Sequence, residues 1–125
     1  MRDAWNIGVL GICLSFAAAP AAHAARVVVF GDSWANQGWD EFAQVFVDRG
    51  HPEMTVAEYA VGGTTAEGWA AQPDALPNAV AENPDAAYVW LSIGGNDIKA
   101  HLKDGRFRSL RRDNRDNIRI MLDAL

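Results

Sequence analysis

Three apolar runs in this chain each end at a glycine-containing polar segment, and this arrangement restricts the folds open to it. Residues 26–30 are followed by Gly31-Asp32-Ser33, residues 54–61 by Gly62-Gly63-Thr64, and residues 87–93 by Gly94-Gly95-Asn96-Asp97. Short, continuous apolar runs are typical of strands buried on both faces of a parallel sheet. Because the carboxyl ends of parallel strands share one edge, we expect the three segments to converge on one site.

Helical patterns alternate with these strands. Trp39, Phe42 and Phe46 recur at helical spacing before Gly50, and they predict a helix over about 36–49. Three further helices are expected: a short one capped by Thr64 or Thr65 that runs through Gln72, one between Pro73 and Asn83-Pro84, and a long amphipathic one that contains Leu110 and runs to Leu125. The alternation of strand and helix predicts an α/β fold with a doubly wound parallel sheet and helices on both faces.

The first 24 residues have the features of a secretory signal peptide. Arg2 precedes an apolar run over 7–19, and Ala22-His23-Ala24 forms a small-residue cleavage site. One alternative is a transmembrane anchor, for which the run is short against the roughly 20 apolar residues required. Another is a lipid anchor at Cys13, for which the preceding isoleucine is unsuitable. We therefore expect cleavage after Ala24, a secreted or periplasmic protein without a stable membrane anchor, and one mature unit over 25–125.

The composition excludes several other classes of function. Cys13 belongs to the leader, so the mature chain has no cysteine and forms neither a disulfide nor a thiolate metal site. The net charge of −5 argues against non-specific binding to nucleic acid, which needs a basic surface. Eight of the eleven basic residues nevertheless lie within 99–119. This stretch is either a solvated helix face or a basic rim that attracts an anionic substrate.

Residues in the three converging segments fit the chemistry of a serine hydrolase. Ester hydrolysis by serine needs an exposed hydroxyl, a base, and donors aimed at the oxygen that becomes negative. Ser33 supplies a hydroxyl, Gly63 a backbone N–H that no Cβ shields, and Asn96 a side-chain amide. Taken alone, each segment also has a structural interpretation: a helix cap for Ser33, a tight turn for Gly62-Gly63, and a turn or cap for Asn96-Asp97.

The order, spacing and residue types of these segments resemble those of the SGNH, or GDSL-type, hydrolase family of esterases and lipases. The resemblance implies that Ser33 is the nucleophile and that the N–H groups of Ser33 and Gly63, with the Asn96 amide, form the oxyanion hole. It implies structural roles for Asp32 and Asp97 as acceptors that hold their loops in shape. No metal or cofactor is implied, and the expected substrate is a small-molecule, saccharide or lipid ester.

The resemblance also implies a flavodoxin-like, three-layer α/β/α sandwich, usually of five parallel strands, of which this sequence supplies about three. The Asp-x-x-His block that completes the family's triad is expected downstream of Leu125. We therefore expect residues 25–125 to be the N-terminal part of an SGNH hydrolase domain. This part alone is expected to be almost inactive, because losing the triad histidine costs on the order of 10⁶ in turnover.

Two other functions remain open at this point. One is a non-catalytic binding protein that keeps the SGNH crevice and recognises an acylated saccharide or lipid. The other is a flavodoxin-like anion binder that holds a phosphate at the helix N-terminus after Gly31-Asp32-Ser33.

Most histidine and tryptophan residues outside the motifs are expected to have structural rather than functional roles. His51 and His101 are expected on the surface, and Trp39 and Trp90 in the core. Trp34 is the exception, because it stands beside the expected nucleophile where the family usually has leucine. An aromatic face at that position can stack on a sugar ring or line an acyl pocket.

Overall fold

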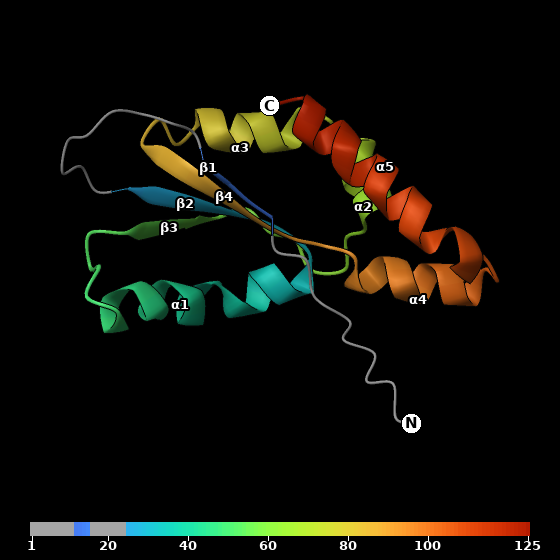
Figure 1. The fold of residues 1–125 in the computed structure, drawn as a ribbon, viewed down its shortest axis with the longest axis horizontal. Coiled ribbons are helices and arrows are strands. Elements are labelled where there is room, and N and C mark those ends of the chain that lie inside the picture. Colours follow the sequence, from blue (N-terminus) through green and yellow to red (C-terminus); the bar gives the residue numbers. More distant parts are fainter. Residues whose placement is uncertain (1–11, 16–24) are drawn as a thin grey trace, which may run out of the picture.

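A four-stranded sheet with helices on both faces forms the body of the protein (Figure 1). The computed structural model describes residues 12–15 and 25–125. The strands are β1 (Ile12–Ser15), β2 (Arg26–Gly31), β3 (Thr55–Glu58) and β4 (Ala86–Ser92). The helices are α1 (Ser33–Asp48), α2 (Ala66–Ala70), α3 (Ala75–Ala81), α4 (Gly95–Lys103), the 3-10 turn η1 (Phe107–Ser109) and α5 (Leu110–Asp123). The predicted leader, residues 1–24, lies outside the described residues except for β1.

The strands follow the order β1-β4-β2-β3 across the sheet. The central strand β2 pairs in parallel with both neighbours, so that Val28 lies opposite Ala57 of β3 and Val89 of β4. β1 runs antiparallel along the outer edge of β4. The three parallel strands with their flanking helices confirm the predicted three-layer α/β/α fold. β1 adds a fourth strand that the sequence pattern does not indicate.

The first of two apolar cores lies between the sheet and the helices α2, α3 and α5. Val28 and Phe30 of β2 pack there with Trp69, Leu76 and Met121, one from each helix. The ring centroids of Phe30 and Trp69 are 4.4 Å apart. The apolar side chains of β2 that point to this face thus hold the upper helical layer in Figure 1.

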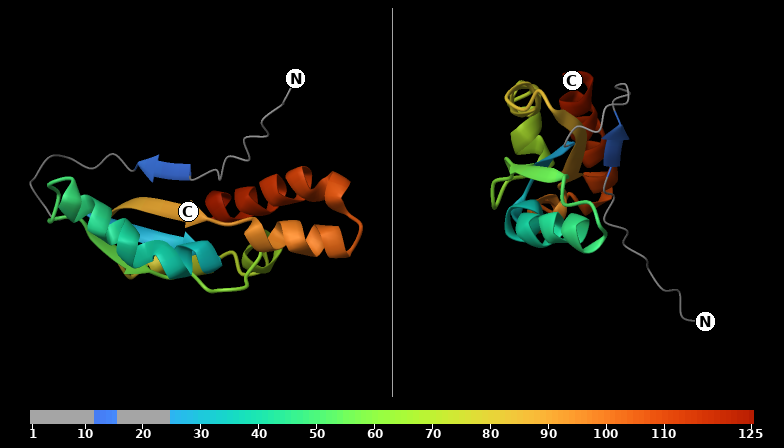
Figure 2. Two further views of the ribbon diagram at one scale, coloured as in Figure 1. Left: turned by 90° about the horizontal axis from the view of Figure 1, so that it is seen from below. Right: turned by 90° about the vertical axis from the view of Figure 1, so that its left-hand side faces the viewer.

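The second core lies between the opposite face of the sheet and α1, and the end-on view in Figure 2 separates these layers. Phe42 and Phe46 of α1 pack against β2 and β4, and Phe42 stacks on Trp90 with ring centroids 4.5 Å apart. The predicted core position of Trp90 is confirmed. The predicted core position of Trp39 is wrong, because Phe42 and Phe46 cover the sheet and leave Trp39 exposed on α1.

Two element boundaries near the predicted site differ from the sequence-based ranges. α1 begins at Ser33 rather than near residue 36, because Asp32 caps the helix there. β3 ends at Glu58 rather than at Val61, although the Tyr59 and Val61 N–H groups still donate to carbonyls of β2. The chain after β3 therefore continues to follow β2 toward the carboxyl end of the sheet.

The region after β4 forms two helices where the periodicity predicts one long helix. Gly105 has φ of +67° and turns the chain between α4 and α5, in a conformation that glycine adopts without steric cost. α5 begins at Leu110, as the periodicity requires, and ends at Asp123 rather than at Leu125. Helix ends fray, so the last residues leave the helical geometry. None of the described helices is long and apolar enough to cross a membrane.

Candidate active site

The carboxyl end of β2 is held directly against the end of β4. Gly31 has φ of +145°, and a Cβ built on it would lie 1.9 Å from the carbonyl oxygen of Ser92. Only glycine fits at this position, because any side chain would overlap the backbone of β4. The Asp32 N–H then donates to the same Ser92 oxygen at 2.9 Å. These contacts join the first predicted segment to the strand that leads into the third.

Asp32 caps α1 and leaves Ser33 free of that role. Its buried carboxylate accepts a hydrogen bond from the Trp34 N–H at 3.0 Å. Ser33 is therefore the first residue of the helix, and the interpretation of Ser33 as a cap is wrong. The predicted structural role of Asp32 is confirmed by the same hydrogen bond.

The loop between β3 and α2 closes over the same strand end. The Val61 N–H donates to the Gly31 carbonyl at 3.0 Å, and the Thr64 hydroxyl lies 3.1 Å from that oxygen. Gly63 has φ of +86°, which favours glycine at this turn. Gly62 passes so close to α1 that an added Cβ would lie 3.9 Å from the Ser33 Cβ. The second predicted segment thus lies beside the predicted nucleophile.

Two side chains in the first turn of α4 tie the third segment to this loop. The Asn96 amide donates to the Thr64 carbonyl at 2.9 Å, so Asn96 bonds to a different loop and its interpretation as a simple cap is wrong. Both carboxylate oxygens of Asp97 accept the Ala66 N–H at 3.0 Å. Burial of Asp97 raises the pKa of its carboxyl, although the Ala66 bond lowers it. The predicted structural role of Asp97 is confirmed.

The N-terminal ends of α1 and α4 point toward each other on one side of the sheet (Figure 1). Ser33 is the first residue of α1, and Asn96 is the second residue of α4. A helix N-terminus carries unpaired backbone N–H groups and a partial positive charge. Two such termini directed at one site stabilise negative charge that develops there.

A family model described as GDSL-like Lipase/Acylhydrolase matches residues 27–125, a range that contains all three segments. The chain belongs to the GDSL-like lipase/acylhydrolase family. No curated protein and no solved structure matches the chain significantly. The match confirms the family that the motifs indicate, and it supports a lipase or acylhydrolase type of function with ester substrates.

His101 is buried in this GDSL-family domain, so its predicted surface position is wrong. Its side chain lies between α4 and α5, with Nδ1 2.9 Å from the Asp97 carbonyl oxygen and Nε2 3.1 Å from Asp113 Oδ2. Asp97 and His101 are four residues apart and therefore share one helix face. This spacing is the signal that would have placed His101 inward with Asp97. The predicted surface position of His51 is confirmed.

Both ring nitrogens of His101 face oxygen atoms that only accept hydrogen bonds. A neutral imidazole has one N–H and satisfies one of them, whereas the imidazolium satisfies both. The bonds to Asp113 and to the Asp97 carbonyl raise the pKa of His101, the Asp113 bond having the larger effect. Both ring nitrogens are thus engaged by groups on α4 and α5, and neither is directed at Ser33.

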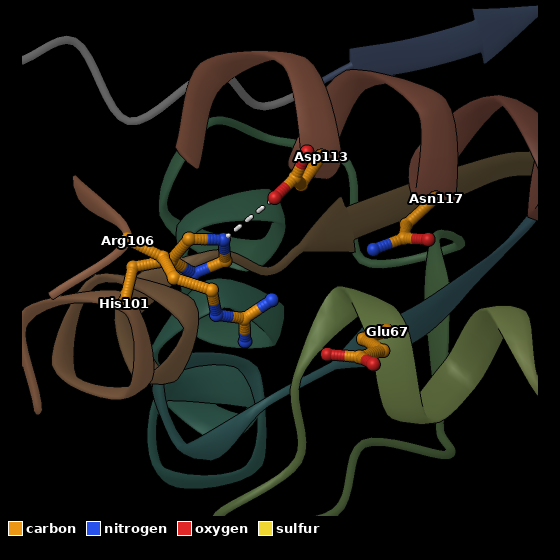
Figure 3. Close-up of a pocket in the computed structure, with 5 residues that line it drawn as sticks. All are labelled: Glu67, His101, Arg106, Asp113 and Asn117. Atoms are coloured by element: carbon orange, nitrogen blue, oxygen red, sulfur yellow. Dashed lines mark hydrogen bonds and ion pairs between the residues drawn. The ribbon is translucent and has the colours of Figure 1, made fainter. Parts of the chain in front are cut away.

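A pocket of about 200 Å³ lies beside this pair, between α2, α4 and α5 (Figure 3). Its walls carry charges of both signs, and they are formed by Glu67, His101, Arg106, Asp113 and Asn117. None of the three predicted catalytic residues is among them, so the pocket is separate from the candidate active site.

The basic residues of the stretch 99–119 are exposed, and half of them form ion pairs with nearby carboxylates. The pairs are Arg106 with Asp104, Arg112 with Asp113, Arg115 with Asp116, and Arg119 with Asp123. This local neutralisation is typical of a solvated helix face, the first of the two interpretations given for the stretch.

Proposed function

We propose that this chain is the nucleophile-bearing part of a serine ester hydrolase that works through an acyl-enzyme. The Ser33 hydroxyl attacks the ester carbonyl carbon and gives its proton to a base, while the carbonyl oxygen becomes negative. The carbon–oxygen bond to the alcohol then breaks, and the alcohol leaves with the proton that the base took. Water, deprotonated by the same base, attacks the acylated serine, releases the carboxylic acid and restores the Ser33 hydroxyl.

The observation that carries this proposal is the attachment of Asn96 to Thr64 and of Thr64 to Gly31. The Asn96 amide nitrogen has two hydrogens, and the bond to Thr64 uses one of them. The other is available to an oxyanion, together with the backbone N–H groups of Ser33 and Gly63. Donors that are fixed before the reaction stabilise the developing charge without further reorganisation.

The proposed base is the histidine of an Asp-x-x-His block located in the natural polypeptide outside these residues. Neither histidine of the described chain is placed to serve Ser33. His51 follows the far end of α1, whose 16 residues span about 24 Å. His101 is occupied by Asp97 and Asp113. Export of the mature chain through the predicted leader belongs to the same proposal.

The test is hydrolysis of p-nitrophenyl butyrate by the longest natural polypeptide that contains these residues. Ser33→Ala should lower kcat by several orders of magnitude, up to about 10⁶, and Asn96→Ala by about 10²–10³. Asn78→Ala changes an exposed asparagine outside the site, on α3, and should leave kcat unchanged. Mass spectrometry of the quenched reaction should find the acyl group on Ser33.

Equal rates for the parent and Ser33→Ala contradict the proposal. If both rates equal the uncatalysed rate and the ester still binds, the chain is a binding protein that keeps the SGNH crevice. Full activity of the 125-residue chain alone contradicts the placement of the base outside it.

A further inference from the structure

The helix α4 buries two polar side chains and exposes two large apolar ones, which lie beside the exposed Lys99 and Lys103. Asp97 is 2% exposed and His101 3%, whereas Ile98 is 36% exposed and Leu102 60%. Helices at the surface of a globular protein ordinarily bury their apolar face and expose the polar one. Packing in the core therefore does not explain why residues 98 and 102 of α4 are apolar.

Trp34 extends this apolar surface to the candidate active site. Its side chain is 74% exposed, an unusual position for so large an aromatic residue. The indole lies against the first residue of α4, since a Cβ on Gly95 would be 3.2 Å from Nε1 and 3.4 Å from Cδ1 of Trp34. Glycine at position 95 thus leaves room for the indole against the start of α4.

Trp34, Ile98 and Leu102 form an apolar strip that begins beside Ser33. Gly95, Ile98 and Leu102 follow at spacings of three and four residues, which places them on one face of α4. The helical rise puts Leu102 about 10 Å beyond Gly95 along the axis. The strip therefore leads away from the nucleophile along the exposed side of α4.

We infer that the apolar strip holds the acyl chain of the ester substrate and selects medium-chain over short-chain acyl groups, an inference that rests on the proposed function. The strip starts where the ester carbonyl must lie, so the occupant is a part of the substrate. A sugar needs hydrogen-bonding partners, and Ile98 and Leu102 offer none. An octanoyl chain extends over α4 from Ser33, whereas an acetyl group contacts at most Trp34.

The test compares kcat/KM for p-nitrophenyl octanoate and p-nitrophenyl acetate in the longest natural polypeptide that contains these residues. Each buried methylene contributes about fourfold in affinity, so Ile98→Ser and Leu102→Ser should each lower the octanoate-to-acetate ratio by about 10-fold. Trp34→Ala should lower the octanoate-to-acetate ratio by more than either serine variant does. Ile120→Ser is the matched control, because Ile120 is exposed to a similar degree on α5. Calorimetric titration with octanoate should show the same order of affinities.

The outcomes separate this inference from the proposed function. If Ser33→Ala abolishes hydrolysis but the strip variants keep the parent ratio, the inference fails and the proposed function stands. If the strip variants lose octanoate binding but Ser33→Ala hydrolyses like the parent, the proposed function fails and the strip remains an apolar ligand site. A dimer in sedimentation that Leu102→Ser dissociates, with no change in the ratio, overturns the inference in favour of a second copy as the occupant.

Discussion

The Nε2 atom of His101 lies 3.1 Å from Asp113 Oδ2, and this contact joins α4 to α5. The other carboxylate oxygen of Asp113 pairs with Arg112 at 3.2 Å. Because α4 also carries Asn96, the pair fixes the helix that presents the proposed oxyanion donor. A buried histidine that is paired with a carboxylate in this way makes the stability of the site depend on pH.

The protein should become less stable as the pH rises from 6 to 9. The pKa of His101 is raised above 6.5, so its contribution is complete below pH 6.5 and is lost as the pH rises through the folded-state value. Asp113 keeps its charge throughout this range, because the Ser109 hydroxyl and the His101 ring lower its pKa to about 2. Urea unfolding followed by tryptophan fluorescence should show a falling midpoint over this range.

Two variants identify the group responsible for that pH dependence. Asp113→Asn removes the partner of His101 and should flatten the dependence between pH 6 and 9. His51→Gln changes the exposed histidine and should leave the pH dependence of the urea midpoint unchanged. A parent midpoint that stays constant over this range would show that His101 does not gain a proton on folding.

Gly31→Ala should destabilise the fold by more than about 3 kcal/mol, because its Cβ would overlap the Ser92 carbonyl in a backbone conformation that favours glycine. Gly38→Ala is the control in α1, where nothing lies within 4 Å of an added Cβ. It should stabilise the helix by about 0.5–1 kcal/mol. Urea midpoints of the two variants measure both effects, and a similar shift in both would contradict the close contact of β2 with β4.

The convergence of the three segments was predictable because it depends on strand topology. Gly31 and Asn96 each follow a parallel strand, and parallel strands end at one edge of the sheet. The structural role of Asp97 was likewise predictable from the family resemblance. These features need only the order of strands and the residues that follow them.

The environment of His101 was not predictable in the same way. Its bond to Asp113 spans 12 residues and depends on the turn at Gly105 and on the packing angle of α5. Apolar periodicity indicates where α5 lies along the chain but not which polar side chains face α4. The antiparallel pairing of β1 with β4 is similar, because a short apolar run carries no information about its partner.

The mature protein should begin at Ala25 after export. Cleavage after Ala24 removes β1, so the outer edge of β4 loses the partner described here and becomes available for another strand. Intact-mass measurement and N-terminal sequencing of the protein secreted by a host that processes signal peptides would establish the first residue. Recovery of a chain that still contains residues 1–24 would contradict the predicted leader.

Asp97→Asn should lower the free energy of unfolding by about 2–3 kcal/mol. The buried carboxylate accepts the Ala66 N–H with both oxygens, whereas asparagine keeps one acceptor and brings a second donor to the same place. Asp123→Asn, on the exposed end of α5, is the matched control and should shift the urea midpoint little. Because Ala66 follows the loop that carries Gly63, Asp97→Asn should also lower kcat more than it raises KM. Equal urea midpoints for the two variants would show that the Asp97–Ala66 bond does not hold this loop.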